Sequence, residues 1–259
     1  MRPLRQVTRL LGIASVLATA VIDYNMRRGW RWDRPRRASW LQVWSRTLLS
    51  SFGIRLKVIG AAPKGGFMVA NHLSYLDILV LGAACPQVFL SKSEVEAWPL
   101  IGTLTKYAGT LYIDRGKRSD VTTKEAAFEE VIRSGLPMTV FLEGTSTDGS
   151  KVLPFRSSLL QPVVKNQWTV TPAYLKYECE GGDPAMDVCY WGDMTFGPHI
   201  VNMAKVKRVD AIVAFGETRE PGEDRKALAK ALHDDVLALR DLAEAENSNS
   251  GYEYGASVI

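Results

Sequence analysis

Short runs of β-forming residues alternate with helical stretches from residue 54 onward, and this alternation constrains the fold most strongly. The predicted strands are Arg55–Val58, Gly66–Ala70, Val88–Ser91, Thr110–Asp114, Met138–Leu142, Trp168–Leu175, Asp187–Trp191 and Asp210–Phe215. The predicted helices are Tyr75–Ala84, Thr122–Ser134 and Asp224–Ala245. Strands separated by helices form sheets that helices cover on both faces. The sequence therefore predicts an α/β domain with a layered, mostly parallel central sheet flanked by helices.

The size and composition of the chain suffice for a core that needs no metal or disulfide. Its 259 residues are 46% hydrophobic, which excludes a disordered protein. The three cysteines and three histidines form no close-spaced cluster, so we expect no structural zinc site. The odd number of cysteines argues against a disulfide framework, although an oxidising compartment would permit a bridge between Cys179 and Cys189 across a hairpin.

The positive charge of the chain is concentrated at its amino terminus. The formal net charge is +4, yet residues 1–57 alone carry twelve cations and only two acids. Four of the seven tryptophans also lie there: Trp30, Trp32, Trp40 and Trp44. Arginine and tryptophan together are typical of segments that bind at a membrane surface. Nucleic acid fits less well, because the cations border a continuous apolar run and no recognition pattern accompanies them.

The apolar run is Leu10–Ile22, with arginines before it. It is shorter than the roughly 20 residues that a membrane-spanning helix needs. A cleaved signal peptide is an alternative, since a basic start precedes the run and Ala18-Thr19-Ala20 offers small residues. The six arginines between residues 27 and 37 favour retention on the cytoplasmic side instead. We therefore expect an uncleaved segment on the cytoplasmic face of the inner membrane.

A second helix is predicted to start near Pro35, and its apolar residues form one stripe. Trp40, Trp44, Leu48 and Phe52 recur every four residues along it. We expect the two helices to lie in an anionic bilayer surface; the alternative is that the stripe packs on the domain core. The expected organisation is a membrane-associated helical segment at 1–54, an α/β domain at 55–246 and a flexible tail at 247–259.

A histidine and an aspartate follow the strand Gly66–Ala70 directly. His72 stands at the carboxyl end of the strand, and Asp77 lies in the first turn of the next helix. A turn at Leu73-Ser74 can fold the carboxylate back onto the imidazole, where it would fix the tautomer and steady the imidazolium. This spacing predicts a general base that works near neutral pH.

Two further strand ends carry polar groups. Asp114-Arg115 ends the fourth strand with a cation, and Glu143-Gly144-Thr145 ends the fifth with an acid, a glycine and a hydroxyl. Each has a plainer explanation as a surface ion pair or a turn. Ligands of open α/β sheets collect at the carboxyl ends of strands, so the three ends together predict one site.

In these residues the chain resembles the glycerolipid acyltransferases, which include lysophosphatidate acyltransferase. Their first block, Asn-His-x4-Asp, is matched by Asn71 to Asp77. The second is matched by Tyr112 to Arg115, and the third by Phe141, Glu143, Gly144 and Thr145. A fourth, a hydrophobic residue before proline, resembles Val170-Thr171-Pro172-Ala173. The resemblance spans roughly residues 55–215.

The resemblance implies a reaction and a role for each matched residue. His72 would take the proton of a lysolipid hydroxyl, with Asp77 as its orienting partner, and the oxygen would attack an acyl thioester directly. The acyl donor would be acyl-CoA or acyl carrier protein, with no metal and no further cofactor. The expected substrate-binding residues are Asn71, Arg115, Glu143, Gly144, Thr145 and Arg156.

Two departures from the family pattern bear on the acceptor. Ser146 stands where lysophosphatidate enzymes commonly carry arginine, and Leu142 replaces their proline. Loss of the arginine removes a bidentate partner for a phosphate monoester, which Arg156 or Lys151 could replace. The expected acceptors are a lysophospholipid, lysophosphatidate or lyso-ornithine lipid. A non-catalytic lipid-binding protein on the same fold is the alternative, and a hydrolase is disfavoured because no Gly-x-Ser-x-Gly elbow occurs.

Overall fold

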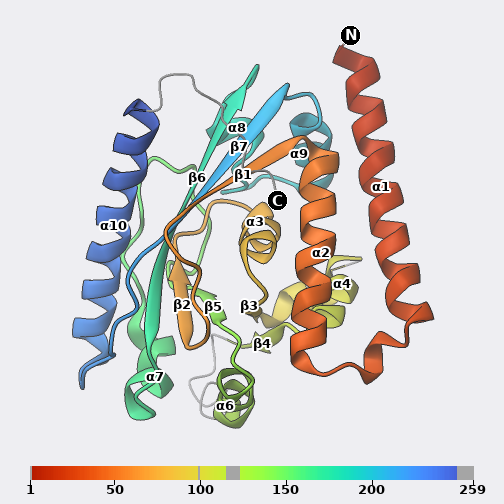
Figure 1. The fold of residues 1–259 in the computed structure, drawn as a ribbon. Coiled ribbons are helices and arrows are strands. Elements are labelled where there is room, and N and C mark those ends of the chain that lie inside the picture. Colours follow the sequence, from red (N-terminus) through yellow and green to blue (C-terminus); the bar gives the residue numbers. More distant parts are fainter. Residues whose placement is uncertain (1, 99, 115–122, 250–259) are drawn as a thin grey trace.

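A twisted seven-stranded sheet with helices on both faces forms the body of the protein (Figure 1). The structure is a computed structural model that describes residues 2–98, 100–114 and 123–249. The strands are β1 (Ile54–Ile59), β2 (Phe67–Ala70), β3 (Val88–Lys92), β4 (Leu111–Ile113), β5 (Met138–Phe141), β6 (Val170–Glu180) and β7 (Arg208–Phe215). Their order across the sheet is β1-β7-β6-β2-β5-β3-β4. Among the described strand pairs, β6 and β7 run antiparallel and the others run parallel. The predicted α/β class and mostly parallel sheet are confirmed.

One predicted strand is wrong. In place of Asp187–Trp191 the chain forms the short helix α8 (Pro184–Asp187), followed by an irregular segment. Asp183 caps this helix through a hydrogen bond from the amide of Ala185 (3.0 Å), and Pro184 occupies its first turn. A side-chain cap and a proline at the first position favour a helix start over a strand.

The three predicted helices of the domain are present. They are α3 (Leu76–Ala84), α6 (Glu125–Arg133) and α10 (Arg225–Asn249). The structure adds α4 (Ile101–Tyr107), α7 (Gln161–Lys165), α9 (Phe196–Met203) and three short 3₁₀ helices, η1 (Gly29–Arg31), η2 (Ser93–Ala97) and η3 (Ser157–Leu160). These additions have at most eight residues each, too few for a clear helical period.

Alternate residues of the central strands separate the core into two layers. Met68 and Ala70 of β2 face the cluster built with α1 (Arg2–Met26), α2 (Arg34–Phe52) and α3. Phe67 and Val69 face the opposite cluster, built with α6, α7 and α10. Because side chains alternate along a strand, each central strand is apolar on both faces. The ends of these buried strands are the places where polar groups can reach the surface.

The amphipathic stripe of α2 is buried against the domain. Trp40, Leu48 and Phe52 are no more than 6% exposed, and they belong to the core cluster that includes α3. The expectation that this stripe faces the bilayer is therefore wrong, and its alternative, packing on the core, holds. A helix with this pattern buries its apolar face wherever a second apolar face is available, and α3 supplies one.

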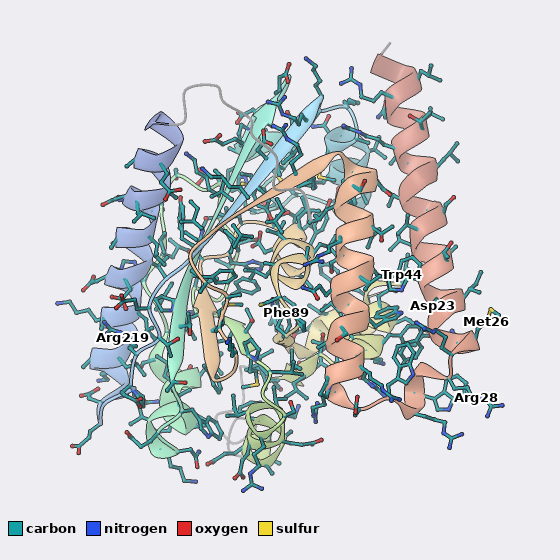
Figure 2. The ribbon with its side chains drawn as sticks, in the orientation of Figure 1. Asp23, Met26, Arg28, Trp44, Phe89 and Arg219 are labelled. Carbon is teal, nitrogen blue, oxygen red and sulfur yellow. The ribbon has the colours of Figure 1, made fainter. Side chains whose placement is uncertain are left out.

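Helix α1 runs antiparallel to α2 on its outer side (Figure 1). It is longer than the apolar run that predicted it, and its segment Leu4–Met26 has the length and mean hydropathy, 1.5, of a membrane-spanning helix. At the turn between the two helices, Asp23 accepts hydrogen bonds from the indoles of Trp40 (3.1 Å) and Trp44 (3.2 Å). Met26 projects away from the domain at this turn (Figure 2).

Candidate active site

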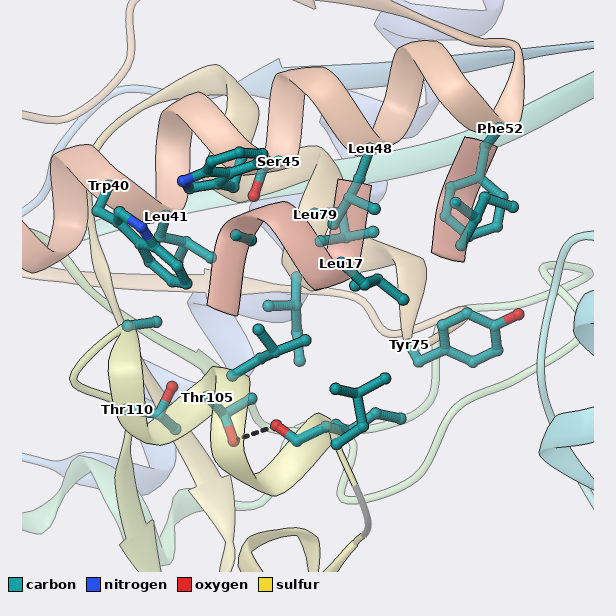
Figure 3. A pocket seen from close by; sticks show the side chains of 18 of the residues that line it. Leu17, Trp40, Leu41, Ser45, Leu48, Phe52, Tyr75, Leu79, Thr105 and Thr110 are labelled. Atoms are coloured by element: carbon teal, nitrogen blue, oxygen red, sulfur yellow. Dashed lines mark hydrogen bonds between the residues drawn. The ribbon is translucent and has the colours of Figure 1, made fainter. Parts of the chain in front are cut away.

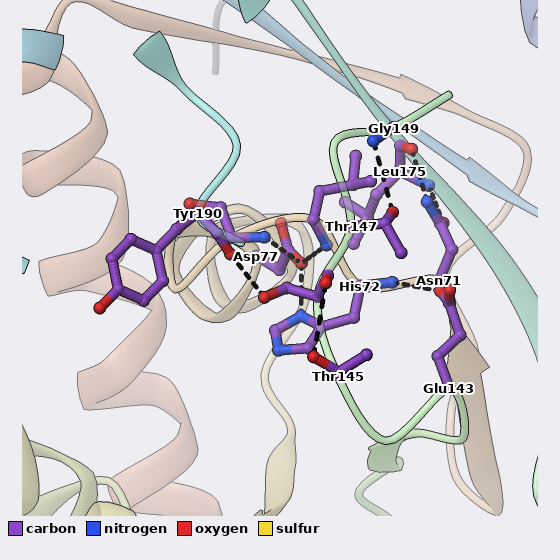
Figure 4. Close-up of polar contacts among 12 residues, drawn as sticks. Asn71, His72, Asp77, Glu143, Thr145, Thr147, Gly149, Leu175 and Tyr190 are labelled. Carbon is purple, nitrogen blue, oxygen red and sulfur yellow. Dashed lines mark hydrogen bonds and ion pairs between the residues drawn. The ribbon is translucent and has the colours of Figure 1, made fainter. Parts of the chain in front are cut away.

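The predicted histidine and aspartate lie in contact. His72 follows the last residue of β2, and Asp77 lies in the first turn of α3. The Nδ1 atom of His72 is 2.7 Å from Oδ2 of Asp77 (Figure 4). The loop between them folds the carboxylate back onto the ring, as the spacing predicts. His72 keeps 24% of its side chain exposed, whereas Asp77 is fully buried.

Asp77 receives three further hydrogen bonds. The backbone amides of Leu73 (2.7 Å) and Ser74 (3.1 Å) donate to Oδ2, the oxygen that faces the imidazole. The hydroxyl of Tyr177 donates to the other oxygen, Oδ1, at 2.6 Å. These donors hold the buried carboxylate in one rotamer. It fixes the ring so that Nδ1 carries a proton and Nε2 is the basic atom.

Asn71 joins the end of β2 to β6. Its side-chain nitrogen donates to the carbonyl of Leu175 (3.0 Å), and its oxygen accepts from the amide of the same residue (2.7 Å). The side chain is 2% exposed. Its polar atoms thus bond the backbone of β6, and Asn71 fixes the strand end that carries His72.

Glu143 braces the same loop from the end of β5. Its two carboxylate oxygens accept hydrogen bonds from the amides of His72 (2.7 Å) and Leu153 (2.8 Å). Burial raises the pKa of Glu143, although the two amides and His72 offset part of that rise. The carboxylate therefore holds two backbone segments beside each other.

Gly144 and Arg156 form an exposed cationic corner beside this brace. Gly144 has a φ of +81°, and a Cβ at this position would lie 3.0 Å from Cζ of Arg156. The guanidinium therefore packs close to the glycine, at a position that a side chain would obstruct. Arg156 and Thr145 are both exposed. Arg115, the other expected cation, lies outside the described residues.

Ser146 and Thr147 fold the loop after β5 across the histidine. The hydroxyl of Ser146 donates to the carbonyl of Tyr190, and the amide of Thr147 donates to the carbonyl of His72 (3.0 Å). The ring of His72 stacks on Phe141, with 4.1 Å between centroids. Contacts thus fix the backbone of His72 through Thr147, its Nδ1 edge through Asp77 and one ring face through Phe141. Its Nε2 atom makes no hydrogen bond to any residue that the structure describes.

An apolar cavity of about 190 Å³ lies on the α3 side of the sheet (Figure 3). Its wall comes from α1, α2, α3, α4 and α9, and includes Leu17, Trp44, Leu48, Leu79 and Leu104. Tyr75, three residues after His72, forms part of the wall, whereas His72 itself does not. Within the described ranges, no cluster of three or more metal-binding side chains occurs and the three cysteines are free.

Comparison with known proteins gives one family. The acyltransferase family model matches residues 55–176. The lyso-ornithine lipid O-acyltransferase of Brucella abortus is 30% identical over 244 residues, which cover 87% of this chain and 88% of that protein. The 1-acyl-sn-glycerol-3-phosphate acyltransferase of Neisseria meningitidis is 31% identical over 207 residues, 75% of this chain and 78% of that one.

A solved structure shares the fold. The crystal structure of the 1-acyl-sn-glycerophosphate acyltransferase of Thermotoga maritima superposes with a TM-score of 0.67. The match covers 94% of this chain and 98% of that one at 18% sequence identity. Because it includes almost the whole chain, the two amino-terminal helices belong to the shared architecture.

Proposed function

This chain belongs to the acyltransferase family and is a lysolipid O-acyltransferase, and we propose that His72 is its general base. The observation that carries the proposal is the 2.7 Å contact between Nδ1 of His72 and Asp77, made while Nε2 has no described partner. An imidazole held in this tautomer can accept a proton at Nε2. The alternative of a non-catalytic lipid-binding protein is set aside by the membership of this enzyme family.

In the proposed reaction, Nε2 of His72 takes the proton of the lysolipid hydroxyl as its oxygen attacks the thioester carbon of acyl-CoA or acyl carrier protein. The carbon–oxygen bond forms, the carbon–sulfur bond breaks, and the thiolate leaves with the proton that His72 returns. Asp77 stabilises the intervening imidazolium. A thioester is already activated, so the protein mainly has to position two substrates and move one proton.

We assign the apolar cavity to the acyl chain of a substrate. Its lining side chains are almost all apolar, and it lies against α3, the helix that starts beside His72. Tyr75, three residues after His72, links the cavity wall to the segment that carries the histidine. Burial of methylene groups there would supply binding energy at about 0.8 kcal/mol for each group.

We propose an acceptor without a phosphate monoester, such as lyso-ornithine lipid. Ser146 stands where an arginine would bind such a phosphate, and its hydroxyl is engaged by the carbonyl of Tyr190. The exposed guanidinium of Arg156, over Gly144, is then a candidate partner for an anionic group of the acceptor. Relatives with both kinds of acceptor are about equally similar to this chain.

We propose that α1 lies on the cytoplasmic surface of the inner membrane and does not cross it. Both ends of α1 are fixed to the domain: Gln6 donates to the carbonyl of Val201 (2.8 Å), and Asp23 accepts from Trp44. A spanning α1 would draw α2 and α9 into the hydrocarbon with it. The arginines between residues 27 and 37 suit anionic headgroups on the cytoplasmic side.

The base is tested by His72→Ala in an assay of transfer from acyl-CoA and acyl carrier protein to lysolipids. We expect a loss of about 10²–10⁴-fold in kcat, the usual contribution of a general base. The kcat of Asp77→Asn should lie between those of wild type and His72→Ala, because this substitution keeps the imidazole and disturbs only its tautomer. His233→Ala, at another half-buried histidine, is the control. Wild-type turnover in His72→Ala would contradict the proposal.

A further inference from the structure

Strand β6 extends beyond its partner β2 and passes beneath the loop that runs from His72 to Asp77. Its parallel pairing with β2 ends at Ala173, after which β6 continues to Glu180 along β7. Ala173, Leu175 and Tyr177 alternate onto the face that carries α3, and all three belong to its core cluster. Tyr174, between them, faces the opposite side and packs in the cluster with α10. Of the two tyrosines, the extension therefore brings Tyr177 to the side of the sheet that carries α3.

The phenol of Tyr177 ends on the carboxylate that holds His72. Its hydroxyl is 2.6 Å from Oδ1 of Asp77, and both residues are buried, at 4% and 0% exposure. Oδ2 accepts from the imidazole and from two backbone amides, so Tyr177 is the one side chain other than His72 that is found bonded to this carboxylate among the described residues. It contacts neither the imidazole nor, by its burial, any substrate.

We propose that Tyr177 is a positioning residue that sets the basicity of the Asp77–His72 pair through its hydrogen bond to Oδ1. This inference rests on the proposed role of His72. A donor at Oδ1 withdraws charge from the carboxylate, so the pair binds its extra proton less tightly. Without the donor, one oxygen of a fully buried carboxylate loses its partner, and both the rotamer of Asp77 and the ring of His72 are held less firmly.

The surroundings leave this donor role intact over the working range of pH. Burial and the Asp77 charge raise the pKa of Tyr177 well above its ordinary value, so the hydroxyl stays protonated. Among the described residues, the other titratable groups that face the pair include Tyr75 of the loop before α3, Glu143 at the end of β5 and Cys189 after α8. Burial raises the pKa of Cys189 to about 12, so this thiol also stays neutral.

The test is Tyr177→Phe, which removes the hydroxyl and keeps the ring. We expect kcat to fall about 10-fold, less than the 10²–10⁴-fold that loss of the base itself costs, with KM nearly unchanged. The acidic limb of the pH profile of kcat should move to higher pH, because the carboxylate without its donor favours the protonated pair. Tyr174→Phe removes a hydroxyl from a buried tyrosine on the opposite face of the same strand. This control should change neither kcat nor the position of the acidic limb.

Two further measurements separate positioning from general stability. In an Asp77→Asn background, Tyr177→Phe should reduce kcat by less than about twofold, since residues that act through one another are not additive. Replacement of Tyr177 by 3-fluorotyrosine, a stronger donor of nearly the same shape, should move the acidic limb to lower pH. This second variant also serves if Tyr177→Phe does not fold.

Additive effects of the two substitutions, or an acidic limb that stays in place in both Tyr177 variants, would overturn the proposal. The role of His72 is judged separately in the same assay. If wild type transfers acyl groups and His72→Ala does not, the general base stands whatever the Tyr177 variants do.

Discussion

Glu143 fixes the backbone around His72. It accepts from two backbone amides, and a glutamine could offer its single oxygen to only one of them. The amide nitrogen of the glutamine would then face the second backbone N–H. Both groups are donors, so no hydrogen bond could form between them. We expect Glu143→Gln to lose kcat by about 10-fold or more, from displacement of His72, and to do so without a matching rise in KM.

The same residue predicts a dependence of stability on pH. Burial raises the pKa of Glu143, so between its ordinary value and the raised one the folded state binds more protons than the unfolded state. The free energy of unfolding of the wild type should therefore fall as pH rises through that window, whereas Glu143→Gln has no such contribution. Denaturant unfolding of both proteins at several pH values measures the difference, and parallel curves would contradict the assigned direction.

Ser146 makes a second prediction at the scale of one residue. Its hydroxyl bonds the carbonyl of Tyr190, close to the corner formed by Gly144 and Arg156. Ser146→Arg would place a bidentate donor there and should raise kcat/KM for lysophosphatidate relative to lyso-ornithine lipid by about 10-fold. Ser150→Arg, in the exposed part of the same loop, is the matched control. Equal preference in both variants, or wild-type transfer to lysophosphatidate alone, would refute the argument from Ser146.

At the scale of elements, the cavity depends on how α1 packs beside α2, α3 and α4. Ala20 of α1 is 1% exposed and lines the cavity, so a larger side chain at this position would occupy space assigned to the acyl chain. We expect Ala20→Leu to lower kcat/KM for long-chain donors by at least about tenfold relative to medium-chain donors. Ala229→Leu adds the same volume in the separate core under α10. If Ala20→Leu left the dependence of kcat/KM on acyl-chain length unchanged, the assignment of the cavity to the acyl chain would be contradicted.

Elements with a long, regular pattern could be predicted from the sequence, and those fixed by tertiary contacts could not. The buried strands around β2 are short apolar runs and the long α10 has a helical period, and the loop from His72 to Asp77 is local enough for its fold to follow from spacing. Tyr177 is 100 residues away from Asp77 in sequence. No periodicity reports a contact of that range; only the register of β6 brings the phenol under the carboxylate.

The same distinction applies to two of the polar residues that were expected to bind substrate. The sequence marks Asn71 and Glu143 as polar residues at strand ends, which predicts contact with a ligand. Their partners turn out to be backbone amides and carbonyls of Leu175, His72 and Leu153. A polar side chain at a strand end can bind a ligand or complete the backbone hydrogen bonds that the strand leaves open, and composition alone does not separate these uses.

At the scale of the whole molecule, the outer face of α1 is the surface to test for membrane binding. Its large apolar residues that point outward are Leu4 (71% exposed), Val7 (53%), Leu11 (63%), Ile22 (56%) and Met26 (79%). Between Leu11 and Ile22 the exposed residues are small: Ala14, Ser15, Ala18 and Thr19. The inner face carries Ile13, Ala20 and Tyr24, each buried against the domain. A helix apolar on both faces, with one covered by protein, has its other face left for lipid.

Leu11→Lys should therefore reduce binding to vesicles. Burial of one leucine in the acyl region contributes about 1.5–3 kcal/mol, so the partition coefficient should fall by roughly 10-fold or more. Leu242→Lys, which changes a leucine 46% exposed on α10, on the far side of the sheet from α1, should bind as wild type does. Flotation with vesicles of increasing anionic lipid content measures both effects. Wild-type recovery should rise with anionic content because residues 1–57 carry twelve cations. Equal losses in the two variants, or recovery that ignores lipid charge, would place the membrane surface elsewhere.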